Sequence, residues 1–190
     1  IEVIGRLIEN RQSGLFDQEP CESDSSSLAA AHLVDAAIDL VKIELLEQIR
    51  ANPVLQPARS IRDTAIAAVL LMDGQIDHAT GLFMLRERGS PLPLWCTDPV
   101  EEDLRTGNPI LKVLTHYCGV ARRRIPLDGS SFTIDAAPTL RLRAMPLSSK
   151  AAPYSPHREN PVPGDNIGIS LTDTASGKTL FYAPGLGEID

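Results

Sequence analysis

Residues 65–71, AIAAVLL, and residues 73–78, DGQIDH, decide the fold that the sequence predicts. A continuous apolar run of this length indicates a strand that is buried on both faces, usually because helices cover both sides of its sheet. A polar stretch directly after such a strand lies where ligands and catalytic groups are favoured, since the backbone there is free and the strand beneath is rigid. We therefore expect an α/β fold with a site at the end of this strand.

Hydrophobic spacing, capping residues and prolines predict the elements on either side of this strand. A helix is expected from residue 28 to the break at Pro53, after a polar, serine-rich connection. Further helices are expected over residues 80–88, over residues 99–104 with Asp98 as the N-cap, and over residues 109–117. Strands are expected over residues 92–96, 123–126, 132–134, 140–145, 166–172 and 179–183, the last two as a hairpin. Between them, residues 151–165 contain four prolines and form a long loop of the kind that is disproportionately functional.

Composition excludes several classes of protein. The 190 residues, 43% of them hydrophobic, suit one soluble globular domain. A net charge of -7 argues against a nucleic-acid surface, and the basic cluster at residues 122–124 is more typical of a solvated strand edge. The three cysteines, Cys21, Cys96 and Cys118, form no CxxC pair, so reduced thiols in a cytoplasm are expected rather than a structural zinc cluster or a disulfide framework. No apolar run approaches the roughly 18 residues of a membrane span.

Asp77 and His78 are the candidate metal ligands. A carboxylate oxygen beside an imidazole suits iron, zinc or manganese. By spacing alone, a helix cap and a surface histidine are the more frequent explanation of such a pair, and that alternative stays open. His32 and His116 are expected to be surface or packed histidines, and His157, in the proline-rich loop, to have a structural or exposed role.

Several short motifs follow one another in a fixed order along the chain. Residues 73–78 have the frame of the HxHxDH motif of the metallo-β-lactamase fold, with Asp73 and Gln75 in place of the first two histidines. The stretches that follow are ATGL at 79–82, LRE at 85–87, WCT at 95–97, EDL at 102–104, TG at 106–107, APYSPHR at 152–158, PGDN at 163–166 and FYAPGLG at 181–187. In this order they resemble the coenzyme PQQ (pyrroloquinoline quinone) synthesis protein B family, over about residues 45–190.

This resemblance implies a metallo-β-lactamase-like αββα sandwich. The sandwich is expected to be incomplete, because the family's N-terminal Cys cluster and its later HxNN ligands have no counterpart in these residues. Residues 1–44 are taken as a divergent segment with a linker and the start of a helix, and residues 45–190 as a partial domain.

The resemblance also implies a site and a function. Asp77 and His78 correspond to the family's active-site ligands for a divalent metal, iron or zinc, and Tyr154, His157 and Arg158 are assigned a substrate-side role. The implied function is PQQ biosynthesis, as metal-dependent oxidation or hydroxylation of a tyrosine-derived precursor in the cytoplasm. The alternatives are a carrier that transports PQQ or its precursor towards the periplasm, or an inactive fragment. The expected partner is PQQ or that precursor, with no nucleic acid and no membrane insertion, and the oligomeric state stays open.

Overall fold

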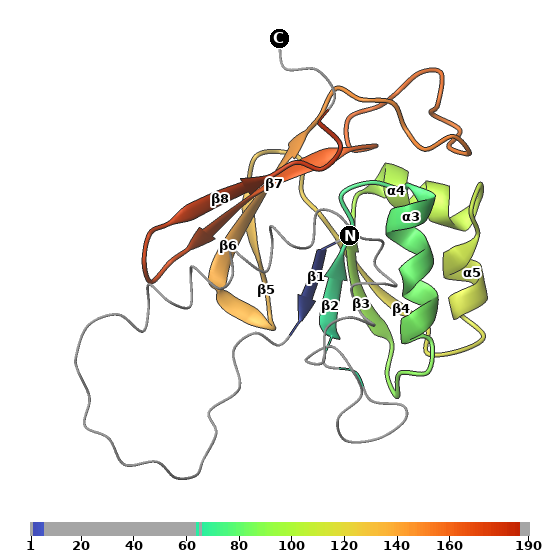
Figure 1. Ribbon diagram of the computed structural model, residues 1–190, viewed down its shortest axis with the longest axis horizontal. Coiled ribbons are helices and arrows are strands. Elements are labelled where there is room, and N and C mark those ends of the chain that lie inside the picture. Colours follow the sequence, from blue (N-terminus) through green and yellow to red (C-terminus); the bar gives the residue numbers. More distant parts are fainter. Residues whose placement is uncertain (1, 6–63, 65, 187–190) are drawn as a thin grey trace.

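The computed structural model describes residues 2–5, 64 and 66–186 (Figure 1). The helix expected from residue 28, the connection before it, Cys21 and His32 lie outside these residues, so the division of the chain at residue 44 stays a prediction. In the described part, the strands form two four-stranded sheets, in the orders β1-β2-β3-β4 and β5-β6-β7-β8. The strands of the first sheet are β1 (Glu2–Gly5), β2 (Ile66–Leu70), β3 (Leu92–Cys96) and β4 (Val120–Arg124), and those of the second are β5 (Ser131–Ile134), β6 (Ala137–Pro146), β7 (Ile167–Asp173) and β8 (Thr179–Tyr182).

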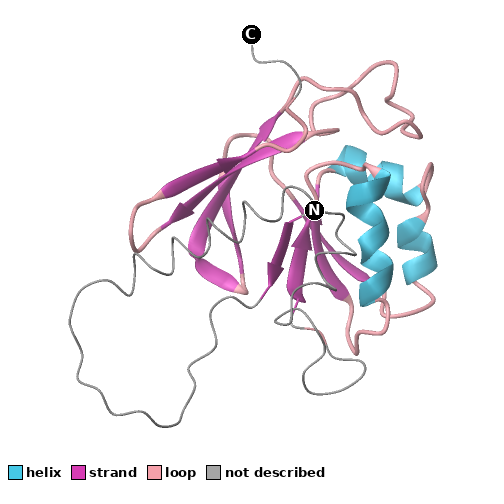
Figure 2. Cartoon of the chain, viewed as in Figure 1, coloured by secondary structure: helices cyan, strands magenta, loops and turns pink. Residues whose placement is uncertain are grey.

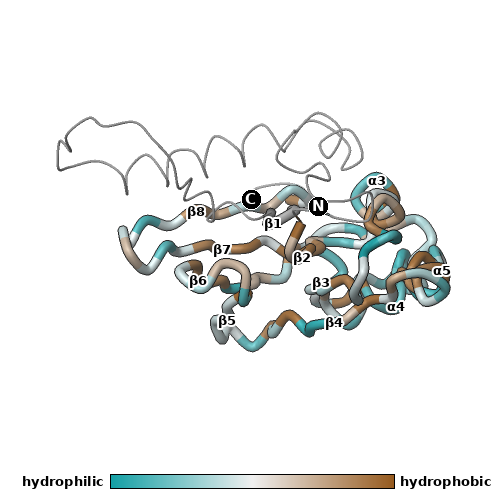
Figure 3. Tube along the Cα trace, turned by 90° about the horizontal axis from the view of Figure 1, so that it is seen from below, coloured by the Kyte–Doolittle hydropathy of each residue, from teal (hydrophilic) through white to brown (hydrophobic). Residues whose placement is uncertain are grey.

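β2 is buried on both faces, as its apolar run predicts. Val69 and Leu71 belong to one buried cluster, whereas Ala68 and Leu70 belong to another, because successive side chains of a strand point to opposite faces. Ile66 joins the first cluster, since the register with β1 shifts between Ile66 and Ala68. One short strand thus contributes to two cores. Figure 3 shows β2 in the colour of hydrophobic residues, and the side chains of this strand pack into both neighbouring layers.

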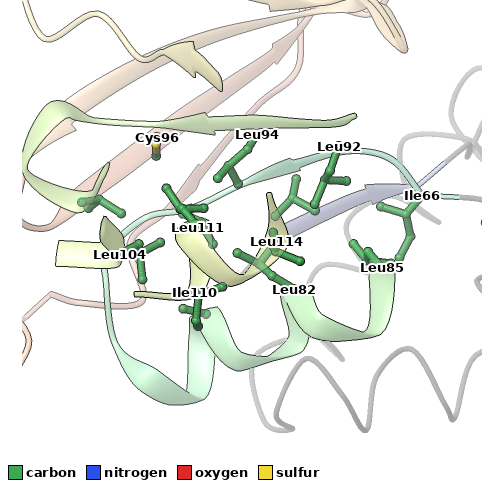
Figure 4. Close-up of a cluster of buried hydrophobic side chains, with 14 residues drawn as sticks. Ile66, Leu82, Leu85, Leu92, Leu94, Cys96, Leu104, Ile110, Leu111 and Leu114 are labelled. Carbon is green, nitrogen blue, oxygen red and sulfur yellow. The ribbon is translucent and has the colours of Figure 1, made fainter. Parts of the chain in front are cut away.

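Helices form the layer on one face of the first sheet (Figure 2). They are α3 (Ile76–Ala79), the 3-10 helix η3 (Thr80–Leu85), α4 (Asp98–Arg105) and α5 (Ile110–Leu114). Figure 4 shows their inward side chains, among them Leu82, Leu104 and Leu114, packed against Leu92 and Leu94 of β3. Burial of each such leucine contributes about 2 kcal/mol to folding.

The second sheet covers the other face of the first. Leu142 of β6 and Ile167 and Ile169 of β7 pack with Leu70 of β2 in the second core. The outer face of β6 is exposed and carries Arg141 and Arg143, so this strand alternates between buried and exposed positions. The observed layers are helix, sheet and sheet, in agreement with the expected α/β sandwich of metallo-β-lactamase type.

Several predicted boundaries were wrong. The strand expected over residues 123–126 is β4, which begins three residues earlier and ends at Arg124, and the strand expected over residues 140–145 is the longer β6. The helix expected at residue 80 begins earlier, at Ile76, and continues as a 3-10 helix that ends at Leu85. Thr97, not Asp98, is the N-cap of α4, because its Oγ1 accepts from Val100 N at 3.4 Å. The helix expected over residues 109–117 is the shorter α5, followed by turns.

The edge strand β4 carries the basic cluster, as expected. Arg122 pairs with Glu101 at 3.1 Å and with Asp98, and Arg124 pairs with Asp98 at 2.6 Å. These pairs attach the strand edge to α4 and leave the cluster with acidic partners. Among the described helices, none is long and apolar enough to cross a membrane.

Candidate functional site

The loop after β2 lies where two sheets meet. Ile167 N of β7 donates to Met72 O at 2.9 Å, and Asp73 forms an isolated antiparallel bridge with Asn166. The parallel strands β2 and β3 both end on this side. The backbone of Asp73 is therefore fixed on both sides before the chain turns into α3.

Asp73 holds the ring of His78. Its side chain is 3% exposed, and its Oδ1 lies 2.7 Å from Nδ1 of His78 and 3.0 Å from Gln75 N. Since a carboxylate only accepts, the proton is assigned to Nδ1, which leaves Nε2 as the nitrogen with a free lone pair. The residue that replaces the first histidine of the family's metal motif is thus a hydrogen-bond partner of a candidate ligand.

Asp77 stands on the open side of the same imidazole. Nε2 of His78 lies 3.8 Å from Oδ2 of Asp77, which is beyond hydrogen-bonding distance. The two side chains are 28% and 55% exposed, so both atoms are accessible from outside. An imidazole nitrogen fixed by a carboxylate behind it, with a second carboxylate beside it, is the arrangement that proteins use for divalent metals.

These two donors fit a divalent metal in kind but not in number. Structural and catalytic sites usually employ three or four protein ligands. Within residues 64 and 66–186, no group of three or more His, Cys, Asp or Glu side chains is arranged to hold a metal ion. The described residues therefore offer part of a metal site, and the roles of Asp77 and His78 as ligands and catalytic groups stay predictions.

The proline-rich loop, residues 151–165, docks beside this site. Thr97 Oγ1 at the end of β3 donates to Gly164 O at 2.6 Å, a buried hydrogen bond across 67 positions. At the other end of α4, Gly107 approaches so closely that a Cβ there would lie 2.1 Å from Tyr154 O. Both ends of α4 thus hold the loop, which Figure 1 shows near this helix.

Tyr154 and Arg158 use their polar atoms within the protein. The hydroxyl of Tyr154 donates to Gly74 O and accepts from Asn108 Nδ2 at 3.4 Å. Burial raises the pKa of that phenol, so it stays a neutral donor. Arg158 Nη1 donates to Ala151 O. Their predicted substrate-side role is untested, and these contacts favour a role in holding the loop.

His157 is held in the same manner as His78. Its Nδ1 lies 3.0 Å from Oδ1 of Asp165, whose side chain is 1% exposed, and its Nε2 lies 3.6 Å from Oε2 of Glu102 on α4. Oδ2 of Asp165 accepts from Val162 N at 2.6 Å. His157 thus joins the loop to α4, whereas His116 is exposed beyond α5.

Two further groups matter for the site. Asp103 of α4 is fully buried beside Gly74, and burial raises the pKa of its carboxyl group. Cys96 is also fully buried, and its pKa is raised to about 11, chiefly by burial, so it stays a thiol at neutral pH.

A separate open hollow of about 450 Å³ is lined by Pro146, Leu147, Ser148, Ser149, Lys150, Pro161, Val162 and Pro163. None of the residues assigned to the substrate lines it.

Sequence reasoning missed Asp103, Asp165 and Glu102. A signal existed for all three, since Glu102 and Asp103 belong to the matching EDL stretch and Asp165 to the matching PGDN stretch. The pattern of the helix alone treats Glu102 and Asp103 as ordinary acids of an amphipathic helix, and the contact of Glu102 with His157 forms only when the loop docks.

The comparisons with known proteins agree with the fold and with the resemblance. A profile of the beta-lactamase superfamily domain matches residues 32–190. "Coenzyme PQQ synthesis protein B" of Azoarcus sp. (strain BH72) is 60% identical over 147 residues, which are 77% of this chain and 48% of that protein. The protein of the same name from Methylobacillus flagellatus is 54% identical over 148 residues, again 77% and 48%.

Among solved structures, Zn(2+)-bound PqqB from Methylobacterium extorquens is similar at a TM-score of 0.61 and 28% identity, covering 76% of this chain and 46% of that one. The chain spans about half the length of the curated relatives it matches. With the profile covering most of its residues, the chain belongs to the beta-lactamase superfamily, and coenzyme PQQ synthesis protein B is among its relatives.

Proposed function

We propose that this chain takes part in PQQ biosynthesis, in a metal-dependent oxidation of a tyrosine-derived precursor. The observation that carries the proposal is the Asp73–His78–Asp77 arrangement at the end of β2, with Nε2 of His78 free and 3.8 Å from Oδ2 of Asp77. The names of the relatives support the pathway, and the zinc of the M. extorquens structure supports a divalent metal.

Each residue of the arrangement has a separate task. Asp77 and His78 would hold the metal, and Asp73 keeps the imidazole in the tautomer that presents Nε2. A metal held by few protein ligands keeps open positions, and iron bound in that way supplies oxygen chemistry. Gln75, at the position of the second motif histidine, offers no imidazole, so the donor set differs from that of a two-zinc hydrolase.

The neighbouring loop would limit access to the metal. Tyr154 is bonded to Gly74 O, and His157 to Asp165, so the loop keeps a fixed position beside the Asp77–His78 pair. A docked loop reduces the freedom of a bound precursor and the access of water. We place this step in the cytoplasm, because the three cysteines form no CxxC pair and their number and spacing suit reduced thiols.

A mass-spectrometric assay tests this proposal. The protein, loaded with iron(II) and supplied with oxygen, a two-electron reductant such as ascorbate and a tyrosine-containing precursor peptide, is expected to produce a peptide with one added oxygen atom, the second oxygen atom being reduced to water. Asp77→Ala is expected to abolish that product. A carrier instead gives no oxidised product and binds PQQ or the precursor equally well after Asp77→Ala, as measured by calorimetry. The control is Asp135→Ala, which removes an exposed carboxylate and is expected to leave the product unchanged.

A further inference from the structure

Asp103 is a buried acid that forms no hydrogen bond of ordinary geometry. The residue is 0% exposed, neither carboxylate oxygen has a well-aligned partner among the described residues, and the Ser155 side chain is only near enough to lower its pKa in part. A buried polar group that lacks a partner destabilises a protein, so such a group calls for an explanation in the surrounding structure.

The carboxyl group of Asp103 lies directly against Gly74. A Cβ built at Gly74 would lie 2.9 Å from Oδ2 and 3.2 Å from Cβ of Asp103. The acid therefore fills the space that a side chain at position 74 would need. Gly74 follows Asp73, the residue that holds His78. Contact at Gly74 therefore acts on the backbone of residues 73–78, the candidate metal loop.

Tyr154 contacts the same residue from the proline-rich loop. Its hydroxyl donates to Gly74 O, while Gly107 and Asn108, just beyond α4, contact its carbonyl oxygen and its hydroxyl. Asp103 and Tyr154 thus enclose Gly74 from two elements that are far apart in the sequence. The enclosure joins the candidate metal loop, α4 and the proline-rich loop.

The surroundings favour the uncharged acid. Burial raises the pKa of Asp103, and the charges of Asp165 and Glu102 raise it further, whereas Ser155 and His157 lower it in part. A neutral carboxyl group has nearly the shape and the hydrogen-bonding capacity of an amide. Asparagine is therefore the matched replacement.

We propose that Asp103 is a positioning residue that fixes Gly74 against Tyr154 and so holds the candidate metal loop in place. The value of this role for catalysis rests on the proposed function. The contact of Asp103 with Gly74 does not. The buried side chain of Asp103 packs directly against Gly74, which has no side chain at that point.

Amide hydrogen exchange of Asp103→Ala tests this role. Reporter amides are Gln75 N, bonded to Asp73 Oδ1, Ala79 N, bonded to Gln75 O, and Ser155 N, bonded to Ala152 O. Exchange at these amides is expected to accelerate about tenfold or more relative to amides of β6 and β7, because the loops open locally. Asp103→Asn is expected to keep wild-type exchange.

Leu104→Ala is the matched control for general destabilisation. Leu104 is the next residue of α4, equally buried, but packs in the helix-side core. If Leu104→Ala accelerates the reporter amides as selectively as Asp103→Ala does, the proposal is overturned. Unchanged reporter exchange in Asp103→Ala, or equal acceleration in Asp103→Asn, overturns it too.

The outcome is separable from that of the proposed function. Asp77→Ala abolishes oxidation under the proposed function and is expected to leave the reporter amides near wild-type exchange. A chain that binds no metal but shows the selective effect of Asp103→Ala retains the positioning role and lacks the proposed chemistry.

Discussion

The candidate metal loop and the proline-rich loop hold their histidines in the same way. In each, a nearly buried aspartate contacts Nδ1, at 2.7 Å for Asp73–His78 and 3.0 Å for Asp165–His157. In each, Nε2 faces an exposed carboxylate, Asp77 at 3.8 Å or Glu102 at 3.6 Å. The difference lies in the origin of these carboxylates, since Asp77 precedes His78 in the chain whereas Glu102 belongs to a separate helix.

This difference indicates that the two histidines have different roles. The Asp77–His78 pair is local and exposed at the end of a buried strand, so it can receive a ligand from outside without rearrangement. The Glu102–His157 pair joins two elements, so a ligand at His157 would compete with the contact that holds the loop. We therefore propose that the first histidine binds a ligand and that the second attaches the loop.

The largest expected effect comes from Gly107→Ala, which attacks the docking of the proline-rich loop. The new Cβ would lie 2.1 Å from Tyr154 O, a backbone atom that cannot rotate away. The free energy of unfolding is expected to fall by about 3 kcal/mol in urea denaturation. At Gly89 a Cβ meets nothing within 4 Å, so Gly89→Ala is the control, and equal losses in the two variants contradict the docking.

Asp73→Ala and Asp165→Ala test whether the two aspartates are equivalent. Each change removes a contact to a histidine and a bond to a backbone N–H, Gln75 N or Val162 N. Each is expected to lower the free energy of unfolding by about 2 kcal/mol, measured by denaturation. Exposed Asp135→Ala is expected to be neutral. A loss in only one of the two loops would show that the resemblance between them is superficial.

Tyr154→Phe measures the direct link between the two loops. It removes the hydroxyl that donates to Gly74 O and keeps the ring, so a loss of about 1 kcal/mol in the free energy of unfolding is expected. Tyr117, 54% exposed, supplies the control Tyr117→Phe. No difference between the two variants argues against the link.

The smallest expected effect is a pH dependence from Asp103, which lies between the loops. Its folded-state pKa is raised above the ordinary 3.8 by burial, so the folded protein binds the proton more tightly than the unfolded chain. Its contribution to stability is present at low pH and is lost as pH rises above 3.8 through the raised pKa. Asp103→Asn is expected to remove this decline, as measured by the difference between the two unfolding profiles from pH 3 to 8. If the stability of the wild type and of Asp103→Asn changes in parallel with pH, the raised pKa of Asp103 is contradicted.

The sequence predicted the sheet layers well because the pattern of β2 is decisive. An apolar run of strand length without polar interruption is typical of a strand buried on both faces, and the two clusters around Ile66 and Leu70 confirm that prediction. Boundaries of the short helices were predicted less well. The N-cap of α4 was misplaced by one residue because both Thr97 and Asp98 are capping residues, and the hydrogen bond to Val100 N decides between them.

The candidate site was only partly predictable. Asp77 and His78 are adjacent, so their motif is visible in the sequence. The role of Asp73 depends on the turn into α3, which brings Nδ1 of His78 back to a residue five positions earlier. The contact of Glu102 with His157 depends on docking across 55 positions, and no local pattern encodes it.

Metal titration of His78→Ala and His157→Ala tests the central claim most directly. Binding of zinc or cobalt(II), followed by calorimetry, is expected to weaken at least about tenfold in His78→Ala and to stay at the wild-type value in His157→Ala. The account is contradicted if His157→Ala weakens binding as much as His78→Ala does, or if the metal binds equally well without His78.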